Sequence, residues 1–425
     1  MKKLLIDILK DEVKPAMGCT EPIAVCLATA KAREVLGKNK FDKITLKVSP
    51  NIYKNGLAVG IPHTNFVGLD IASAIGFLDG DSKDGLKILK GVKDENLKKA
   101  KELAKSIDLD ISDTDEKIYI EVIVESKKDI SKVIIEKKHD EFTYIKKNDK
   151  VILDKKLSKS DKNEIDLSEF YKMKVIDIIN EVEKMDLDDL EFMLDGYHMN
   201  LKMAKKGLNK EYGMGVGYQI KNMVDKKIYN DNLMNKASYL TAGASDARMS
   251  GVNLEVMSSN GSGNNGLTAI LPIVAYSLLN NVSDKKIAKA IAISHLINNY
   301  IKNEIGRLSA ICSCSVSAGS SSSAAIVWLE GGTKEQIEGT IKNMIGNVSG
   351  MVCDGAKEGC AIKLSTAANL SALNAKLALK NSIVPHKNGI INKSVEKTIK
   401  NLGVLSKKGM KITDKEILNI MLEND

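Results

Sequence analysis

Arginine is scarce in this chain of 425 residues. Of its 63 basic side chains, only three are arginines, namely Arg33, Arg248 and Arg307, and the others are lysines. The many lysines are spread along the chain and usually have an acidic residue nearby, whereas a nucleic-acid-binding surface requires clustered basic residues. The net charge of +8 therefore does not indicate a nucleic-acid partner. An arginine inside a segment of small polar residues is instead typical of bidentate recognition of a carboxylate or phosphate.

Long apolar runs are also lacking. A membrane-spanning helix needs about 18 consecutive apolar residues, and no run in this chain is that long. No membrane-spanning helix is therefore predicted. Residues 1–14 begin with lysines and leucines as a signal peptide does, but Asp7 and Asp11 interrupt the apolar run. We therefore expect an amphipathic helix at the start and a cytoplasmic protein.

Cysteine is absent from the whole middle of the chain. The six cysteines form one group near the start and another near the end: Cys19, Cys26, Cys312, Cys314, Cys353 and Cys360. In a chain of this length without a secretory leader, this usage does not indicate a disulfide framework. Free thiols, metal ligands and catalytic thiols remain as interpretations.

The length and the periodicity of the chain predict two domains. Between residues 41 and 155, short runs rich in Ile, Val, Thr and Tyr alternate apolar with polar residues, which is typical of strands. Residues 153–166 are polar enough for a linker, and from there helical spacing continues without convincing strands. We predict an α+β fold in which residues 1–160 form a mixed domain with a mostly antiparallel sheet and residues 161–425 form a mainly helical domain.

Loops rich in Gly, Ser and Asn interrupt the predicted helical part. Residues 241–251 contain Asp246 and Arg248, and residues 257–275 place a polar loop directly before an apolar helix. Backbone N–H groups at such a helix start attract anions. These loops are therefore candidates for a carboxylate or phosphate site, and capped surface loops are the alternative interpretation.

The late cysteines do not have the spacing of a zinc ribbon. Cys312 and Cys314 are separated by one residue and Cys353 and Cys360 by six, whereas structural zinc sites favour C-x2-C pairs. Thiolates from separate loops suit an iron–sulfur cluster, and three ligands would leave one iron open for a substrate. Buried, inert cysteines fit the same spacing.

Six motifs, in order along the chain, resemble the L-cysteine desulfidase family, which is related to the catalytic part of the iron–sulfur L-serine dehydratases. They are GCTEP (18–22), YKNGLAVGIP (53–62), SDARM (245–249), SNGSGN (259–264), LSAIC (308–312) and CDGAKEGC (353–360). The resemblance implies an oxygen-sensitive [4Fe–4S] cluster that releases sulfide, pyruvate and ammonia from L-cysteine without pyridoxal phosphate. The cluster ligands would be Cys312, Cys353 and Cys360, with Cys314 as a packing residue or spare thiol.

Elimination of sulfur requires a Lewis acid for the sulfur and a base for the proton on Cα. Cys19 is the candidate base, because Pro22 marks a helix start whose dipole would favour a thiolate. Glu21 competes for this role, and a fourth cluster ligand is the alternative for Cys19. The expected substrate-binding residues are Lys54, Asn55, Asp246, Arg248, Ser259, Asn260, Gly261 and Ser262.

The remaining charged residues near the late cysteines, and the histidines, are not expected to take part directly in the reaction. Arg307 is expected to support the cluster loop, and Lys357 and Lys363 are expected to soften its negative charge or to remain solvated. The histidines lack paired spacing and are interpreted as structural or surface residues; they are His63, His139, His198, His295 and His386.

Three alternative functions remain open from the sequence. In an L-serine dehydratase, the same open iron would bind the substrate's hydroxyl group. A non-enzymatic iron–sulfur redox sensor would give no function to the two polar loops that are candidates for anion binding. A pyridoxal-phosphate enzyme is disfavoured, because the βαβ alternation expected around its phosphate loop is missing. We expect a homodimer.

Overall fold

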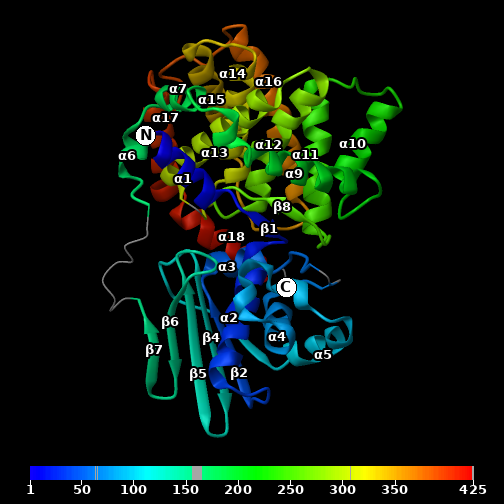
Figure 1. Ribbon diagram of the computed structural model, residues 1–425, viewed down its shortest axis with the longest axis vertical. Helices are drawn as coiled ribbons and strands as arrows, with labels where there is room; N and C mark the ends of the chain where they lie inside the picture. The colour runs from blue at the N-terminus through cyan, green and yellow to red at the C-terminus, as the bar shows by residue number, and fades with distance from the viewer. Residues whose placement is uncertain (63, 65, 156–164, 307, 424–425) are drawn as a thin grey trace.

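The computed structural model describes residues 1–62, 64, 66–155, 165–306 and 308–423, and it has two halves, one above the other in Figure 1. The lower half contains a six-stranded sheet with helices packed against it. The upper half is built almost entirely from helices. The predicted α+β fold is confirmed.

The sheet of the lower half has the strand order β3-β2-β4-β5-β6-β7. Its strands are β2 (Lys43–Val48), β3 (Ile107–Ile111), β4 (Tyr119–Ser126), β5 (Asp129–Glu136), β6 (Phe142–Lys147) and β7 (Lys150–Asp154). The pair β2–β3 is parallel and the other described neighbours are antiparallel. Alternate residues such as Ile44, Leu46 and Val122 point into a buried core, which explains why the alternation in the sequence predicted strands here.

The lower-half core also contains the apolar sides of helices. The helical elements of this half are α2 (Thr20–Leu36), α3 (Pro50–Gly56), α4 (Leu69–Asp79), η1 (Ser82–Gly91) and α5 (Asp94–Ala104). A side chain on Gly76 of α4 would place its Cβ 2.2 Å from the Cys26 carbonyl oxygen of α2. The close packing of these two helices therefore requires glycine at this position.

The upper half has its own core, which surrounds α13 (Asp284–Ile305). The other helical elements after the sheet are α6 (Ser168–Lys172), α7 (Val175–Glu183), α8 (Leu187–Leu190), α9 (Met193–Leu208), α10 (Val216–Asp225), α11 (Leu233–Met249), α12 (Gly263–Leu279), η2 (Cys314–Ala318), α14 (Gly319–Leu329), α15 (Lys334–Val348), α16 (Cys360–Leu379), α17 (Val395–Val404), η3 (Leu405–Gly409) and α18 (Lys411–Glu423). Most of α13 is buried, and its apolar residues, such as Ile291 and Leu296, belong to that core.

Both ends of the chain connect the two halves. The predicted N-terminal amphipathic helix is α1 (Lys2–Glu12), and it buries Leu5, Ile8 and Leu9 in the upper-half core. The chain then enters the lower half through β1 (Pro15–Met17), which pairs with β8 (Glu255–Met257). The prediction that no strand follows the linker is therefore wrong at β8, because three residues are too few to show an alternating pattern.

Residues 241–249 were predicted as a loop and instead form the second half of α11. Small residues allow the neighbouring helices to approach α11 very closely. A Cβ on Gly217 of α10 would lie 2.2 Å from the Gly243 nitrogen, and one on Gly207 of α9 would lie 1.8 Å from the Gly243 oxygen. The glycine and alanine of this segment therefore reflect close helix packing rather than a flexible loop.

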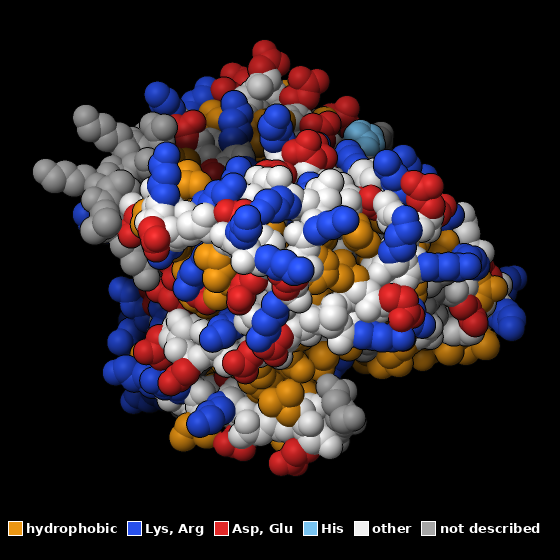
Figure 2. Space-filling model, turned by 90° about the horizontal axis from the view of Figure 1, so that it is seen from below, with side chains coloured by type: hydrophobic (Ala, Val, Ile, Leu, Met, Phe, Trp, Pro, Cys, Tyr) orange, Lys and Arg blue, Asp and Glu red, His pale blue; other side chains and the backbone are white. Residues whose placement is uncertain are grey.

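The described surface agrees with the sequence-based interpretation of charge. On the face in Figure 2, basic and acidic side chains are interspersed around smaller apolar areas. Among the described helices, none combines the length and the apolar character needed to cross a membrane. The predicted linker at residues 153–166 falls mainly on residues 156–164, which lie outside the described part of the chain.

Candidate active site

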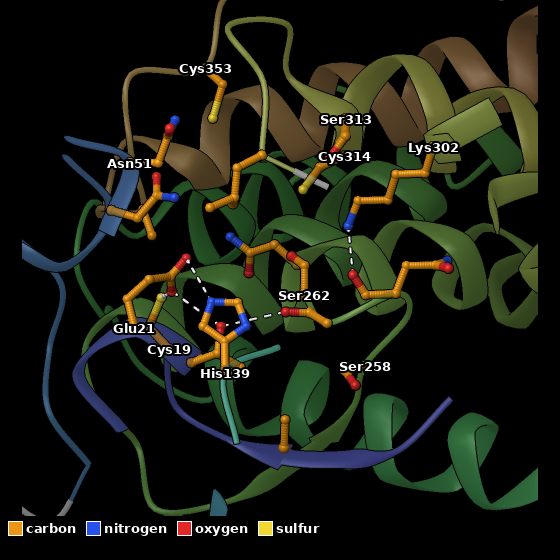
Figure 3. A pocket seen from close by; sticks show the side chains of 18 of the residues that line it. Cys19, Glu21, Asn51, His139, Ser258, Ser262, Lys302, Ser313, Cys314 and Cys353 are labelled. Atoms are coloured by element: carbon orange, nitrogen blue, oxygen red, sulfur yellow. Dashed lines mark hydrogen bonds and ion pairs between the residues drawn. The ribbon is translucent and has the colours of Figure 1, made fainter. Parts of the chain in front are cut away.

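A cavity of about 170 Å³ lies between the two halves (Figure 3). It is smaller than the roughly 300–1,000 Å³ of pockets that take drug-sized ligands, so it suits a ligand of few atoms. Its wall includes most of the predicted site residues: Cys19, Glu21, Lys54, Asn55, Arg248, Asn260, Gly261, Ser262, Cys312, Cys353 and Cys360. Of the predicted set, Asp246 and Ser259 are not among the described lining residues.

A short backbone pairing places two of the thiols in this wall. Ile311 and Val352 form an isolated antiparallel bridge. On either side of it, the Cys312 N–H donates to the Met351 carbonyl at 2.8 Å and the Cys353 N–H donates to the Ala310 carbonyl at 2.7 Å. The two cysteines are therefore fixed by main-chain geometry, although they are distant in sequence.

The Asp-Gly turn after Cys353 carries the chain to Cys360, the first residue of α16. Gly355 has φ of +97°, and a Cβ there would lie 2.2 Å from the Lys54 carbonyl oxygen of α3. Glycine is thus required both by the backbone conformation and by the approach of the lower half. Asp354 forms ion pairs with Lys357 and Lys363. The two lysines therefore lie against the loop of residues 353–360 rather than in bulk solvent.

The thiols lie close enough to influence one another electrostatically. Burial raises the pKa of Cys360 to about 12, and negative charge on Cys312 and Cys353 adds to this increase. A hydrogen bond from Cys314 lowers the pKa of Cys312 to about 6, with Lys363 also favouring the thiolate. Cys314 lines the cavity and also packs against the upper-half core.

The late cysteines supply the soft donors that an iron–sulfur cluster requires. They share one wall of the cavity, and the positive charge of Lys363 lies beside them. Cysteine thiolates are the usual ligands of such a cluster. Among the described residues, no three His, Cys, Asp or Glu side chains are already arranged to hold a metal ion.

The start of α2 brings Cys19 and Glu21 into the same cavity. The Cys19 thiol donates to Glu21 Oε2 at 2.8 Å, and the Thr20 hydroxyl donates to the same oxygen at 3.2 Å. The other carboxylate oxygen, Oε1, lies 3.8 Å from Nε2 of His139 (Figure 3). Gly18 precedes this group with φ of +70° and packs against Pro62, where a Cβ would clash at 2.2 Å.

The protonation of this pair differs from the sequence-based prediction. Burial and the negative charge of Glu21 raise the pKa of the Cys19 thiol well above its ordinary value, although Arg248 opposes the increase. The prediction that the helix start lowers this pKa is therefore wrong. Burial would also raise the pKa of Glu21, but the charge of His139 and the hydrogen bonds from Cys19 and Thr20 hold it below its ordinary value. The pair consists of a neutral thiol beside a carboxylate.

The loop before α12 forms another side of the cavity. Asn260 and Gly261 both have positive φ, at 52° and 74°, and Ser262 caps α12 by accepting from the Asn265 N–H at 3.3 Å. The sequence correctly predicted a polar loop followed by a helix start. The first residues of α12 therefore lie at the cavity wall, where the positive end of the helix dipole favours negative charge.

Side chains of α13 hold this loop from behind. Ser259 turns away from the cavity, and its hydroxyl lies 2.9 Å from both His295 Nδ1 and Asn298 Nδ2. The amide of Asn299 donates to the Asn260 side chain at 2.6 Å, and Lys302 donates to the Asn260 carbonyl at 2.7 Å. Ser259 therefore anchors the loop.

Arg248 is buried beneath the starts of α2 and α12. Its Nη1 donates to Asn264 Oδ1 at 3.0 Å, and its Nη2 donates to the Gly18 carbonyl. Asp246 faces another direction, because its Oδ2 accepts from the Gly217 N–H of α10 at 2.9 Å. Desolvation raises the pKa of Asp246 to about 7. The expected position of Asp246 beside the substrate is not supported by this geometry.

Lys54 reaches the cavity from α3 and links three parts of the chain. Its ammonium donates to the Cys353 carbonyl at 3.1 Å and forms a buried ion pair with Asp414 of α18. Asn51, one turn earlier, donates to the same carboxylate at 2.9 Å. Asn55 also lines the cavity, so both predicted residues of this segment do so.

Several lining residues were not found from the sequence. On α13, Lys302 lines the cavity, and three further polar residues on the same helix face lie behind the loop, at positions 295, 298 and 299. Their helical spacing was a usable signal. Asn264 is the last residue of the quoted motif SNGSGN, but it was not among the predicted site residues. His139 was interpreted as structural or surface and instead lines the cavity. Arg307 and His63 lie outside the described residues.

The ion pair between Lys54 and Asp414 gives a testable stability prediction. Asp414→Ala should cost about 3 kcal/mol in the free energy of unfolding, because it leaves the Lys54 ammonium, which is 2% exposed, without its carboxylate. Lys117→Ala should cost less than about 1 kcal/mol, because Lys117 is 55% exposed and 3.5 Å from Asp414. Urea unfolding of both variants measures the difference.

The same pair predicts a dependence on pH. Burial opposes ionisation of Asp414, but the charge of Lys54 and its hydrogen bond hold the pKa of Asp414 below its ordinary value of 3.8. A lowered pKa stabilises the folded state above the unfolded-state value, and this stabilisation is lost as the pH falls below about 4. The stability difference between the native chain and Asp414→Ala should therefore shrink in that range. A difference that stays constant from about pH 6 to about pH 3 would contradict the assignment.

Comparisons with known proteins identify the family of this chain. Residues 83–419 match the family described as serine dehydratase alpha chain. A UPF0597 protein of Alkaliphilus metalliredigens (strain QYMF) is 52% identical over 431 residues, covering 100% of this chain and 95% of that protein. UPF0597 proteins of Clostridioides difficile (strain 630) and Parabacteroides distasonis are 50% and 40% identical, and each alignment covers 98% of the relative.

The matched residues extend from the lower half through the thiol segments to α18, so they include most of the cavity wall. Membership implies a lyase type of enzyme with an iron–sulfur cluster, which agrees with the resemblance found in the sequence. The chain belongs to the serine dehydratase alpha chain family and is similar over its whole length to UPF0597 proteins.

Proposed function

We propose that this chain is a [4Fe–4S]-dependent L-cysteine desulfidase, a carbon–sulfur lyase that converts L-cysteine into sulfide, pyruvate and ammonia. The observation that carries the proposal is the meeting of three elements in one small cavity: a group of thiols, a thiol–carboxylate pair and an anion-binding helix start. A redox sensor would need only the first of these elements.

The cluster would be held by Cys312, Cys353 and Cys360. Cys314 shares the wall but follows Cys312 by two residues at the start of η2, and it accepts a hydrogen bond from Asn265 at 3.5 Å. Lys363 and the Lys54 ammonium compensate negative charge at this end of the cavity. When bound, the cluster would supply an open iron, a Lewis acid soft enough to take a thiolate.

The substrate carboxylate would lie at the start of α12. Asn260, Gly261, Ser262 and Asn264 line the cavity there, at the positive end of the helix dipole. Arg248 adds a buried positive charge immediately below the first turn of this helix. A helix start combined with a guanidinium is a favourable site for a carboxylate and would orient Cα toward α2.

The proton on Cα would be removed by the pair of Cys19 and Glu21. The thiol is neutral at rest and donates to a carboxylate at 2.8 Å, so Glu21 can accept its proton as the thiolate attacks the Cα–H bond. The electron pair of that bond forms the Cα=Cβ double bond, and the Cβ–S bond breaks with its pair leaving on sulfur. The resulting aminoacrylate hydrolyses through the imine.

The second candidate function is an L-serine dehydratase. The family match favours it, because the family description names serine. The position of Cys19 and Glu21 is compatible with either substrate, since both require loss of a proton from Cα. The atom that leaves Cβ distinguishes the two functions, and a direct comparison of the two substrates decides between them.

The assignment of ligands predicts the iron content of cysteine variants. Cys312→Ala, Cys353→Ala and Cys360→Ala should each lose most of the iron measured per chain after anaerobic purification, because a cluster ligand is removed. Cys314→Ala is the matched control, since it removes a thiol from the same wall, and it should retain its iron. Full iron content in Cys353→Ala would contradict the proposed ligand set.

The assignment of the base predicts a different effect for Cys19→Ser. This variant should keep its iron and its absorption spectrum, because Cys19 is not proposed as a ligand. Its turnover and its exchange of the α-proton with solvent deuterium should both fall by about 10²–10⁴-fold, as is typical when a proton-transfer group is removed. Loss of iron from Cys19→Ser would instead identify Cys19 as a cluster ligand.

A further inference from the structure

A β-hairpin of the lower half closes one side of the cavity. The turn at residues 137–141 connects β5 to β6, and it is held by the Lys138 N–H bond to the Glu136 carbonyl at 2.8 Å and by positive φ at Lys137. Lys138 of this turn forms an ion pair with Asp11 at the end of α1, at 3.6 Å. The hairpin thereby spans the boundary between the two halves and carries His139 into the cavity wall.

His139 continues a line of polar groups that begins at Cys19. The Cys19 sulfur lies 2.8 Å from one oxygen of Glu21, and the other oxygen of Glu21 lies 3.8 Å from Nε2 of His139. All three side chains are buried or nearly so, with Glu21 5% exposed and His139 8% exposed. Figure 3 shows the carboxylate between the sulfur and the imidazole.

Beyond His139 the surroundings become charged and more exposed. The charged and titratable groups that line the cavity near it come from α2, from the end of α1 and from its own hairpin, and they are Glu21, Asp11, Glu12, Lys14, Lys138 and Asp140. Asp140 and Lys14 are exposed to solvent. His139 therefore lies between a buried carboxylate and a hydrated rim.

We infer that His139 carries out of the cavity the proton that each turnover leaves on Glu21, as the last member of a relay that runs from Cys19 through Glu21 to solvent. This inference rests on the proposed function, because it assigns an exit route to the proton that the Cys19–Glu21 pair removes. A proton retained on Glu21 would prevent Glu21 from accepting the Cys19 proton in the next turnover, so a route to water restores the base.

The relay balances as a sequence of simple proton transfers. The thiol proton of Cys19 moves to Glu21, and the thiolate takes the α-proton, which restores the thiol. The His139 imidazolium releases a proton to water at the rim. The neutral imidazole then takes the proton of Glu21 at Nε2, which restores the imidazolium and the Glu21 carboxylate. No oxidant, reductant or second substrate is needed.

The pairing of His139 with Glu21 is tested without any turnover. In the full chain labelled with ¹³C-histidine, the imidazole resonance that disappears in His139→Gln identifies His139. Glu21→Gln should move the titration midpoint of this resonance to lower pH by about one unit, because a carboxylate within reach favours the imidazolium. An unchanged midpoint would overturn the inference while leaving the proposed function intact.

The transfer role is tested with L-cysteine deuterated at Cα. In the holoenzyme, His139→Gln should slow release of this deuterium into water by about 10²-fold while iron content stays unchanged. Lys138→Gln is the matched control on the same hairpin, because it loosens docking to Asp11 without removing the imidazole, and it should release deuterium nearly as fast as the native chain.

Chemical rescue separates proton transfer from a purely structural role. Added imidazole should restore a measurable part of deuterium release in His139→Ala and should have no effect on Lys138→Ala. Equal losses in the histidine and lysine variants, without rescue, would show that the hairpin only closes the cavity. Absence of activity toward cysteine in the native chain would contradict the proposed function, whereas the titration experiment would still test the pairing.

Discussion

The buried guanidinium of Arg248 joins the parts from which the candidate site is made. It is 3% exposed and donates both to the Gly18 carbonyl before α2 and to the Asn264 side chain in the first turn of α12. The first contact fixes the segment that carries Cys19 and Glu21, and the second fixes the helix start that faces the cavity. A planar group with donors in several directions suits this junction, and lysine could not replace it because its single ammonium cannot reach both acceptors in the same geometry.

The site is also incomplete in either half of the molecule alone. The upper half supplies the thiols and the helix start, whereas the lower half supplies Glu21, Lys54 and His139. Main-chain contacts and buried ion pairs cross the boundary, such as the contact of Gly355 with the Lys54 carbonyl and the pair of Lys54 with Asp414. The relative position of the halves therefore determines whether the thiols and the proton-transfer groups face the same small volume.

Much of this arrangement could be predicted from the sequence where a local pattern determines the outcome. Alternating residues predicted the sheet, and Ser262 followed by an apolar run predicted the start of α12. The segment 241–249 was misassigned because glycine and alanine support close helix packing as well as loops, and only the neighbours α9 and α10 distinguish the two. Its residue Asp246 was therefore expected in the cavity but bonds to α10.

Electrostatic properties of the site depended on contacts between distant segments and were harder to predict. The dipole of α2 suggested a thiolate at Cys19, but burial and the neighbouring carboxylate have the larger effect on its pKa. The position of His139 in the cavity wall left no pattern in the sequence, because the hairpin that carries it approaches α2 only through the folding of the sheet. In contrast, the polar face of α13 followed helical spacing and was accessible to sequence analysis.

We propose that the carbon–sulfur bond of L-cysteine is broken in this cavity. This proposal is tested most directly by incubating the anaerobically purified, iron-loaded protein with L-cysteine or L-serine and measuring sulfide and pyruvate. The account predicts equal amounts of sulfide and pyruvate from cysteine, with kcat/KM at least about 10²-fold above that for serine, because a soft thiolate binds iron better than a hydroxyl. Pyruvate from serine with an equal or higher kcat/KM would contradict it and would identify the protein as a serine dehydratase.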